Sequence, residues 1–136
     1  MIIIMDEEKE LVIDHRKYPR YCCRITVFLN ETQMHLYLCD LSLGGCFLEA
    51  PEEYILPRGS LVNLILFLPC IGPVHVEGIV QHHGSNTRKG MGIEFIHFHN
   101  RLHLVFAKFV KILPILEEAR ELYKKLIDRP EDQDDA

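Results

Sequence analysis

The sequence predicts a mainly β protein, a six-stranded antiparallel β-barrel followed by a C-terminal α-helix. Up to residue 98, apolar residues alternate with polar ones in short runs separated by turn residues, which is typical of strands with one buried face. From residue 100 the apolar residues recur every three or four positions, which is the period of a helix. Because hairpin strands leave unpaired edges unless their sheet closes, we expect the strands to form a closed barrel.

The composition indicates one soluble domain with a substantial core. The chain has 136 residues, of which 48% are hydrophobic and 26% are charged. Its net charge of -5 argues against a broad basic surface for DNA or RNA. The apolar start, Met1 to Met5, has no basic region before it and is followed by three acidic residues, so we expect neither a secretory signal nor a transmembrane segment. The protein is therefore expected in the cytoplasm.

The first elements expected are a flexible arm and a β-hairpin. Residues 1–14 are mixed in character and offer little to a core, so they predict the arm. Residues 20–29 alternate and are rich in β-branched residues, and after a short turn residues 32–40 return with apolar side chains on one side. Antiparallel pairing places the start of the first strand beside the end of the second, so Arg20 and Asp40 are expected at the same end of the sheet.

Four further strands are expected after this hairpin. A tight connection at residues 41–45 leads into a short strand at residues 46–50. The apolar run at residues 61–68 is too short for a membrane and ends at Pro69, so it predicts a strand buried on both faces. The last two strands are expected at residues 74–82 and 90–98, with a turn at 84–86, which places the barrel domain at residues 15–99.

Residues 100–128 predict the helix. Asn100 is the expected N-cap, and Pro114 is expected to kink or split the helix because proline lacks an N–H and its ring clashes with a carbonyl one turn earlier. The apolar stripe is wide for a solvated helix, so we expect it to cover the barrel or to form a homodimer with a second copy. The acidic residues 129–136 predict a disordered tail.

A group of residues between positions 16 and 45 has the donors and acceptors needed to bind a planar anion. Arginine binds phosphate bidentately and pairs with the O6 and N7 acceptors of guanine. A carboxylate accepts hydrogen bonds from the N–H donors of the other guanine edge, a serine hydroxyl donates or accepts, and glycine admits close backbone approach. These groups are supplied by Arg16, Arg20, Asp40, Ser42 and Gly45, with Gly44 serving mainly the turn conformation.

Two of these segments carry a family resemblance. The run Arg16-Lys17-Tyr18-Pro19-Arg20 resembles the RxxxR motif of the PilZ domain, and Asp40-Leu41-Ser42-Leu43-Gly44-Gly45 resembles its (D/N)xSxxG motif. They stand in the family's order, with 19 residues between Arg20 and Asp40. The later segment Arg88 to Phe95 resembles the family's glycine-containing final strand. The resemblance extends from Asp14 to Phe98.

PilZ domains are bacterial receptors for the second messenger cyclic di-GMP, and they are built on a small antiparallel β-barrel. The resemblance implies that the two arginines contact phosphate or the guanine O6/N7 edge, that Asp40 and Ser42 take the opposite guanine edge, and that Gly45 admits close approach. His15 stands beside the first arginine, where family members carry a residue that contacts the ligand. A receptor of this kind needs no cofactor and relays its signal to a protein partner.

Other functional classes have less support. Ser42 has no histidine and acid partner at an assignable spacing, and there is no Walker-type loop, so we expect binding without turnover and no catalytic residues. The five cysteines include no CxxC pair, and the histidines at 97, 99 and 103 fall on two different elements, so no metal site is expected. The alternative is a PilZ-type adaptor that binds proteins but not the nucleotide. Such members commonly lack the arginines, which this chain keeps.

Overall fold

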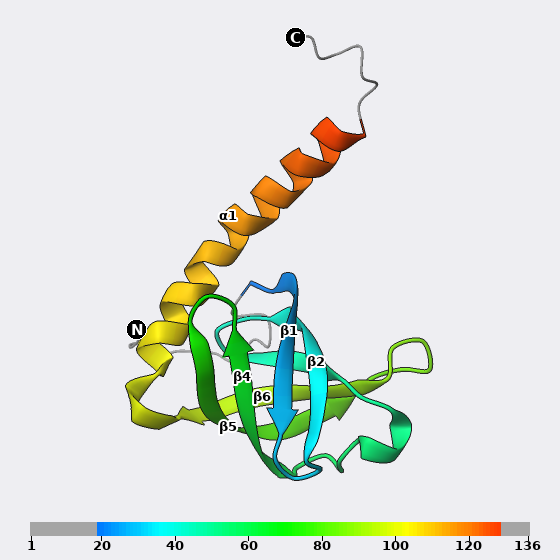
Figure 1. The fold of residues 1–136 in the computed structure, drawn as a ribbon. Coiled ribbons are helices and arrows are strands. Elements are labelled where there is room, and N and C mark those ends of the chain that lie inside the picture. The colour runs from blue at the N-terminus through cyan, green and yellow to red at the C-terminus, as the bar shows by residue number, and fades with distance from the viewer. Residues whose placement is uncertain (1–18, 129–136) are drawn as a thin grey trace.

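The computed structural model describes residues 19–128, except for the side chain of Cys22. The expected arm at 1–14 and the expected tail at 129–136 lie outside the described residues. The described chain forms a barrel of strands with one long α-helix after it (Figure 1). Its elements are β1 (Tyr21–Leu29), β2 (Met34–Leu41), β3 (Gly45–Glu49), the 3-10 helix η1 (Glu52–Tyr54), β4 (Leu61–Leu68), β5 (Gly72–His83), β6 (Gly90–Phe98), the 3-10 helix η2 (His99–Arg101) and α1 (His103–Ile127).

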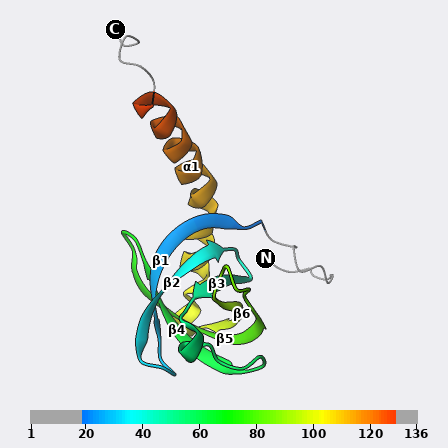
Figure 2. The same ribbon diagram turned by 90° about the vertical axis from the view of Figure 1, so that its right-hand side faces the viewer.

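The strands form a closed antiparallel barrel in the order β1-β2-β3-β6-β5-β4, and β1 closes the sheet by pairing with β4. Every neighbouring pair is antiparallel. The predicted fold class is therefore confirmed. In the first hairpin Tyr21 pairs with Leu41 and Cys22 with Asp40, so Arg20 does lie at the same end of the sheet as Asp40. Figure 2 shows β1, β2 and β3 side by side.

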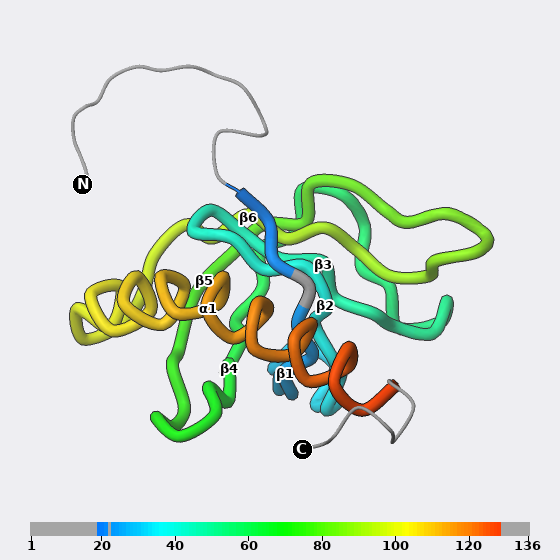
Figure 3. Tube along the Cα trace, turned by 90° about the horizontal axis from the view of Figure 1, so that it is seen from above, coloured from blue at the N-terminus to red at the C-terminus, as the bar shows by residue number. Residues whose placement is uncertain are grey.

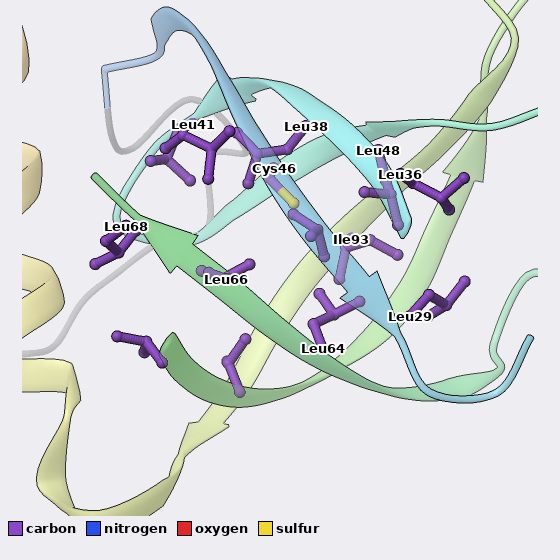
Figure 4. Close-up of a cluster of buried hydrophobic side chains, with 14 of the residues drawn as sticks. Leu29, Leu36, Leu38, Leu41, Cys46, Leu48, Leu64, Leu66, Leu68 and Ile93 are labelled. Atoms are coloured by element: carbon purple, nitrogen blue, oxygen red, sulfur yellow. The ribbon is translucent and has the colours of Figure 1, made fainter. Parts of the chain in front are cut away.

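The core fills the barrel interior with aliphatic side chains from all six strands. Leu38, Leu41, Leu48 and Leu66 are completely buried there, and Figure 4 shows these leucines around Cys46 and Ile93. The packing follows the alternation of each strand, because successive side chains point to opposite faces of the sheet. The interior of the barrel is thus the apolar face that the sequence pattern predicts.

The expectation that the fourth strand is buried on both faces is wrong. Buried and exposed positions alternate along β4, and Leu61 on its outer face is 69% exposed. A single-layered barrel has only one interior, so the outer apolar residues of β4 face solvent unless another element covers them. The continuous apolar run therefore identified the strand but not the environment of its second face.

The proximal half of α1 packs on the barrel, and Figure 3 shows the helix passing over its end. Phe106, Phe109, Val110 and Leu113 are buried and belong to the same core cluster as the strands. Asn100 is not the N-cap, because it lies in η2 with φ 54°, and Leu102 occupies the cap position. Asparagine tolerates this left-handed conformation, which suits the turn between β6 and the helix.

The helix is not split at Pro114, because α1 is a single element from His103 to Ile127 (Figure 1). Proline removes one hydrogen bond of the helical ladder, but the turns immediately before it are anchored to the barrel. Tertiary packing supplies most of a helix's stability in proteins, so this anchoring offsets the local loss. Beyond Pro114 the helix projects away from the barrel.

Candidate functional site

The strand register aligns four residues across the outer face of the barrel. Asp40 on β2 pairs with Phe47 on β3, Phe47 pairs with Gly92 on β6, and Gly92 pairs with His82 on β5. Directly paired residues of antiparallel strands point to the same face of a sheet. We call these four residues the outer row. It begins at the end of the first hairpin, where Arg20 also lies.

Asp40 is held in the outer row by an arginine that lies 48 positions later in the sequence. Arg88 Nη2 donates to Asp40 Oδ2 at 2.6 Å and to Cys39 Sγ at 2.9 Å. A bulge in the β2–β3 pairing between Leu38 and Asp40 accounts for this double contact, since an extra residue re-aims the side chains beside it. The carboxylate of Asp40 keeps its second oxygen for other donors.

These contacts also affect the protonation of Arg88 and Cys39. The hydrogen bonds from Arg88 to Cys39 and to Asp40 raise the pKa of Arg88 above its already high ordinary value, so the guanidinium stays charged. Desolvation raises the pKa of Cys39, although the bond from Arg88 opposes the shift. Arg88 therefore remains a cation beside Asp40 at neutral pH, with Cys39 next to it as a neutral thiol.

Phe47 is an outward-facing aromatic residue that is nevertheless buried. The Arg88 guanidinium lies 4.2 Å from the centroid of its ring, a cation–π contact, and the His82 ring stacks beside it at 6.4 Å between centroids. A Cβ at Gly84 or Gly90 would come within 3 Å of ring atoms of Phe47. Glycine at these positions therefore lets the backbone pack directly on the ring. Phe47 thereby fixes Arg88 over the outer row.

The loop at residues 84–89, between β5 and β6, carries Arg88 and is itself ordered. Ser85 and Arg88 exchange two backbone hydrogen bonds of 3.0 and 3.2 Å, and Gly84 N–H donates to the carbonyl of Gly90 at 2.9 Å. The loop also borders an open groove of about 500 Å³, whose other walls come from β2 and β3 and include Tyr37 and Glu49. Arg88, the partner of Asp40, is thus one of the residues that line a concave surface.

Ser42 shapes the turn between β2 and β3. Its Oγ accepts hydrogen bonds from the backbone N–H groups of Gly44 and Gly45, both at 3.2 Å, while its own N–H donates to the carbonyl of Gly45 at 2.9 Å. Serine side chains commonly close turns in this way. In the described structure the hydroxyl therefore organises the chain that follows Asp40.

Gly45 is required by the packing of two strands. A Cβ at this position would lie 2.1 Å from the carbonyl oxygen of Ile93, which is backbone and cannot move aside. The expected role of Gly45, close approach of a ligand, stays a prediction. In the structure it is the backbone of β6, at Ile93, that approaches Gly45 closely.

The other predicted site residues are placed only in part. Arg20 is exposed and directly precedes β1, whereas His15 and Arg16 lie outside the described residues. The fold therefore brings Arg20, Asp40 and the turn after it to one end of the barrel. Sequence analysis did not identify Phe47, His82 or Arg88 as site residues. Within residues 19–128, no three His, Cys, Asp or Glu side chains are grouped so that they could hold a metal ion.

The sequence matches the family model of the PilZ domain over residues 14–111. The match covers most of the chain and includes the outer row, the turn and the first turns of α1, up to residue 111. The chain therefore belongs to the PilZ domain family. No protein with a curated description matches the sequence. No helix of the described part has the length and apolar character needed to cross a membrane.

Solved structures share the fold at low sequence identity. The inhibitor of motility MotI/DgrA of Bacillus subtilis superposes with a TM-score of 0.61 at 17% identity, covering 86% of this chain and 54% of that one. The PilZ domain of YcgR from Escherichia coli, solved with c-di-GMP, gives 0.60 at 17% identity, covering 82% and 99%. The MrkH–c-di-GMP complex of K. pneumonia gives 0.60 at 22% identity, covering 81% and 57%. This chain thus spans a little over half the length of MotI/DgrA and MrkH.

Proposed function

We propose that this protein is a receptor for cyclic di-GMP in bacterial second-messenger signalling, acting in the cytoplasm without chemical turnover. The observation that carries the proposal is the position of Asp40. Its carboxylate lies on the outer face of the barrel, at the same end of the first hairpin as Arg20. The hydrogen bond from Arg88 holds it there. A charged acceptor in a fixed position is what recognition of a guanine edge requires.

The remaining groups fit the two chemical parts of the ligand. The free oxygen of Asp40 can accept from guanine N–H groups while Arg88 keeps the other oxygen, because an ionised carboxylate has about four acceptor sites. Arg20, together with Arg16, supplies guanidinium groups for phosphate or for the guanine O6/N7 edge. Ser42 pre-shapes the turn, which lowers the ordering cost of binding. His15 and Gly44 are secondary candidates for ligand contact.

The family and the related structures support this proposal. The YcgR PilZ domain and MrkH were both solved with c-di-GMP, and both share the barrel with this chain. The two motifs that resemble those of the family are complete in this sequence, including both arginines. A PilZ-type adaptor that binds only proteins is the second candidate, and loss of nucleotide binding would favour it.

A receptor also needs a way to pass on its signal. We infer that it does so by binding a protein partner, which the distal half of α1 is positioned to contact because it extends beyond the barrel (Figure 1). The same surface suits a homodimer. Neither the ligand nor the relay requires a cofactor.

Calorimetric titration of the purified protein with cyclic di-GMP tests the proposal. We expect saturable binding with a dissociation constant between about 10 nM and about 10 µM. Arg20→Ala should weaken binding by about 1.5 to 3 kcal/mol, the range of charge-assisted hydrogen bonds. Lys108→Ala removes the same charge from α1, which carries none of the proposed ligand-binding residues, and should bind like the wild type. An Arg20→Ala variant with wild-type affinity would remove Arg20 from the site, and no heat with the wild type would favour the adaptor.

A further inference from the structure

The distal half of α1, residues 112–127, has a broad apolar face that is exposed. Ile115 is 62% exposed, Leu122 57% and Leu126 57%, although such side chains are usually covered in a folded protein. We call this face the distal stripe. It consists of Ile112, Ile115, Leu116, Leu122, Tyr123, Leu126 and Ile127.

The distal stripe is not a continuation of the face that docks on the barrel. An α-helix turns about 100° per residue, so the centre of the distal stripe lies about 120° around the helix from the centre of Phe106, Phe109, Val110 and Leu113. The barrel therefore cannot cover both faces of a straight helix. The charged residues of the distal half lie mostly on the side opposite the distal stripe, as they do on helices that pair through one face.

The spacing within the distal stripe is that of a coiled coil. Ile112, Ile115, Ala119, Leu122 and Leu126 follow each other at alternating intervals of three and four residues, the a and d positions of two heptads. Leu116 and Tyr123 widen the face on one side. Its other edge carries charges seven residues apart, in the order Lys111, Glu118 and Lys125.

This charged edge selects the orientation of a second copy. In an antiparallel pair the same edge of each helix meets, whereas in a parallel pair it would meet the apolar edge of Leu116 and Tyr123. In one register, Ala119 packs on Leu122 of the second copy and Ile115 packs on its Leu126. This register places Glu118 of each helix beside Lys125 of the other, so the dimer has two such contacts. A shift by one heptad in either direction opposes Glu118 to Glu118 or Lys125 to Lys125. Of these three registers, only the first has complementary charges.

We propose that the distal half of α1 forms an antiparallel homodimer with this register. The paired segment, residues 115–126, is roughly 18 Å long. Burying the distal stripe of both copies removes on the order of 1,000 Å² of surface, the lower range for a specific interface. We therefore expect a dissociation constant of about 1 to 100 µM. The inference does not depend on nucleotide binding, because it uses no residue of the site.

Sedimentation velocity of the full chain, from about 1 to about 500 µM, measures the dimer directly. Glu118→Lys and Lys125→Glu each convert two attractive contacts into repulsive ones, so each should raise the dissociation constant about tenfold. The double variant restores opposite charges and should return to within about twofold of the wild type. Matched controls are Glu121→Lys and Lys124→Glu, which make the same charge changes on the opposite face and should leave dimerisation unchanged.

Three results would overturn the proposal. A wild-type protein that stays monomeric throughout this range would mean that something else covers the distal stripe, such as residues 1–18 or another protein. A dimer whose dissociation constant is unchanged by Glu118→Lys and by Lys125→Glu would pair in another orientation or through another face. A double variant as weak as the single ones would show that Glu118 and Lys125 do not meet. Circular dichroism of each variant checks that α1 remains helical.

Discussion

Arg88 Nη2 lies 2.6 Å from Asp40 Oδ2, and this ion pair ties the β5–β6 loop to the end of the first hairpin. Both side chains are partly exposed, at 45% and 26%, so the pair by itself contributes little to folding. Its importance lies in position, because the same guanidinium packs on Phe47. The outer row is thereby connected to the loop beside the groove.

Replacing Arg88 by alanine should therefore reduce both stability and ligand affinity. We expect a loss of about 1 kcal/mol in the free energy of unfolding, from an exposed ion pair and a cation–π contact together. Binding of cyclic di-GMP should weaken about three- to tenfold, because Asp40 loses the group that orients it. Urea unfolding and calorimetry measure the two effects.

Lys89→Ala is the matched control for Arg88→Ala. Lys89 lies in the same loop, but its side chain pairs with Glu52 at 3.2 Å and not with Asp40, and both partners are well exposed. It should leave stability and affinity within error of the wild type. An Arg88→Ala variant that binds more tightly would mean that Arg88 competes with the ligand for Asp40.

Two glycines of the site region should respond differently to alanine. At Gly45 the new methyl would meet the carbonyl of Ile93 at 2.1 Å, so β3 and β6 must separate and the barrel should lose about 2 to 4 kcal/mol. At Gly92 it would meet the ring of His82, an exposed side chain that can swing away, so the loss should stay under about 1 kcal/mol. Equal losses in thermal or urea unfolding would contradict this assignment.

Stability should fall in alkaline solution because of Cys46. Desolvation in the core raises the pKa of this thiol far above its ordinary value, whereas in the unfolded chain it ionises at about 8.5. The contribution of the protonated Cys46 thiol to the free energy of unfolding is complete below the unfolded pKa. Above that pKa it decreases by about 1.4 kcal/mol per pH unit. Between pH 8 and 10, the free energy of unfolding measured in urea should decline less steeply for Cys46→Ala than for the wild type. Parallel declines would mean that the thiol is not the cause.

Removal of the chain from Ile115 onward should leave the barrel intact. The residues that dock α1 on the core end at Leu113, so the truncated protein keeps Phe106, Phe109 and Val110 in place. It should melt within about 5 °C of the full chain and still bind cyclic di-GMP, while remaining monomeric. Loss of cooperative melting would show that the distal half belongs to the folding unit.

The sequence predicted most of the fold because its elements have clear periods. The strands begin and end within a few residues of the expected positions, and the pairing of Cys22 with Asp40 follows from the hairpin. Periodicity does not say what covers an outer face, which is why the second face of β4 was assigned wrongly. Of the two outcomes expected at Pro114, a split does not occur and a kink stays a prediction. The packing that holds the helix before Pro114 is not visible in the local sequence.

Sequence motifs identified some candidate site residues, which stay a prediction, and missed the neighbours that depend on tertiary contacts. Asp40 and Ser42 are close in sequence to the turn they serve, so their residue types were informative. Phe47 lies between two core residues and looked like one more apolar position. Only the strand register shows that it faces outward, and only the loop at residues 84–89 brings Arg88 to it. No short pattern marks an arginine whose partners are 48 and 49 positions away.

The most direct test of the central claim, that the Asp40 carboxylate reads a guanine of the ligand, is calorimetric titration of wild type and Asp40→Asn with cyclic di-GMP and with its adenine counterpart. The wild type should prefer the guanine form by at least about tenfold, since adenine lacks the paired N–H donors of guanine. Asp40→Asn should bind the guanine form about 10 to 100 times more weakly and lose most of that preference. An unchanged preference in the variant, or equal binding of both nucleotides by the wild type, would contradict the account.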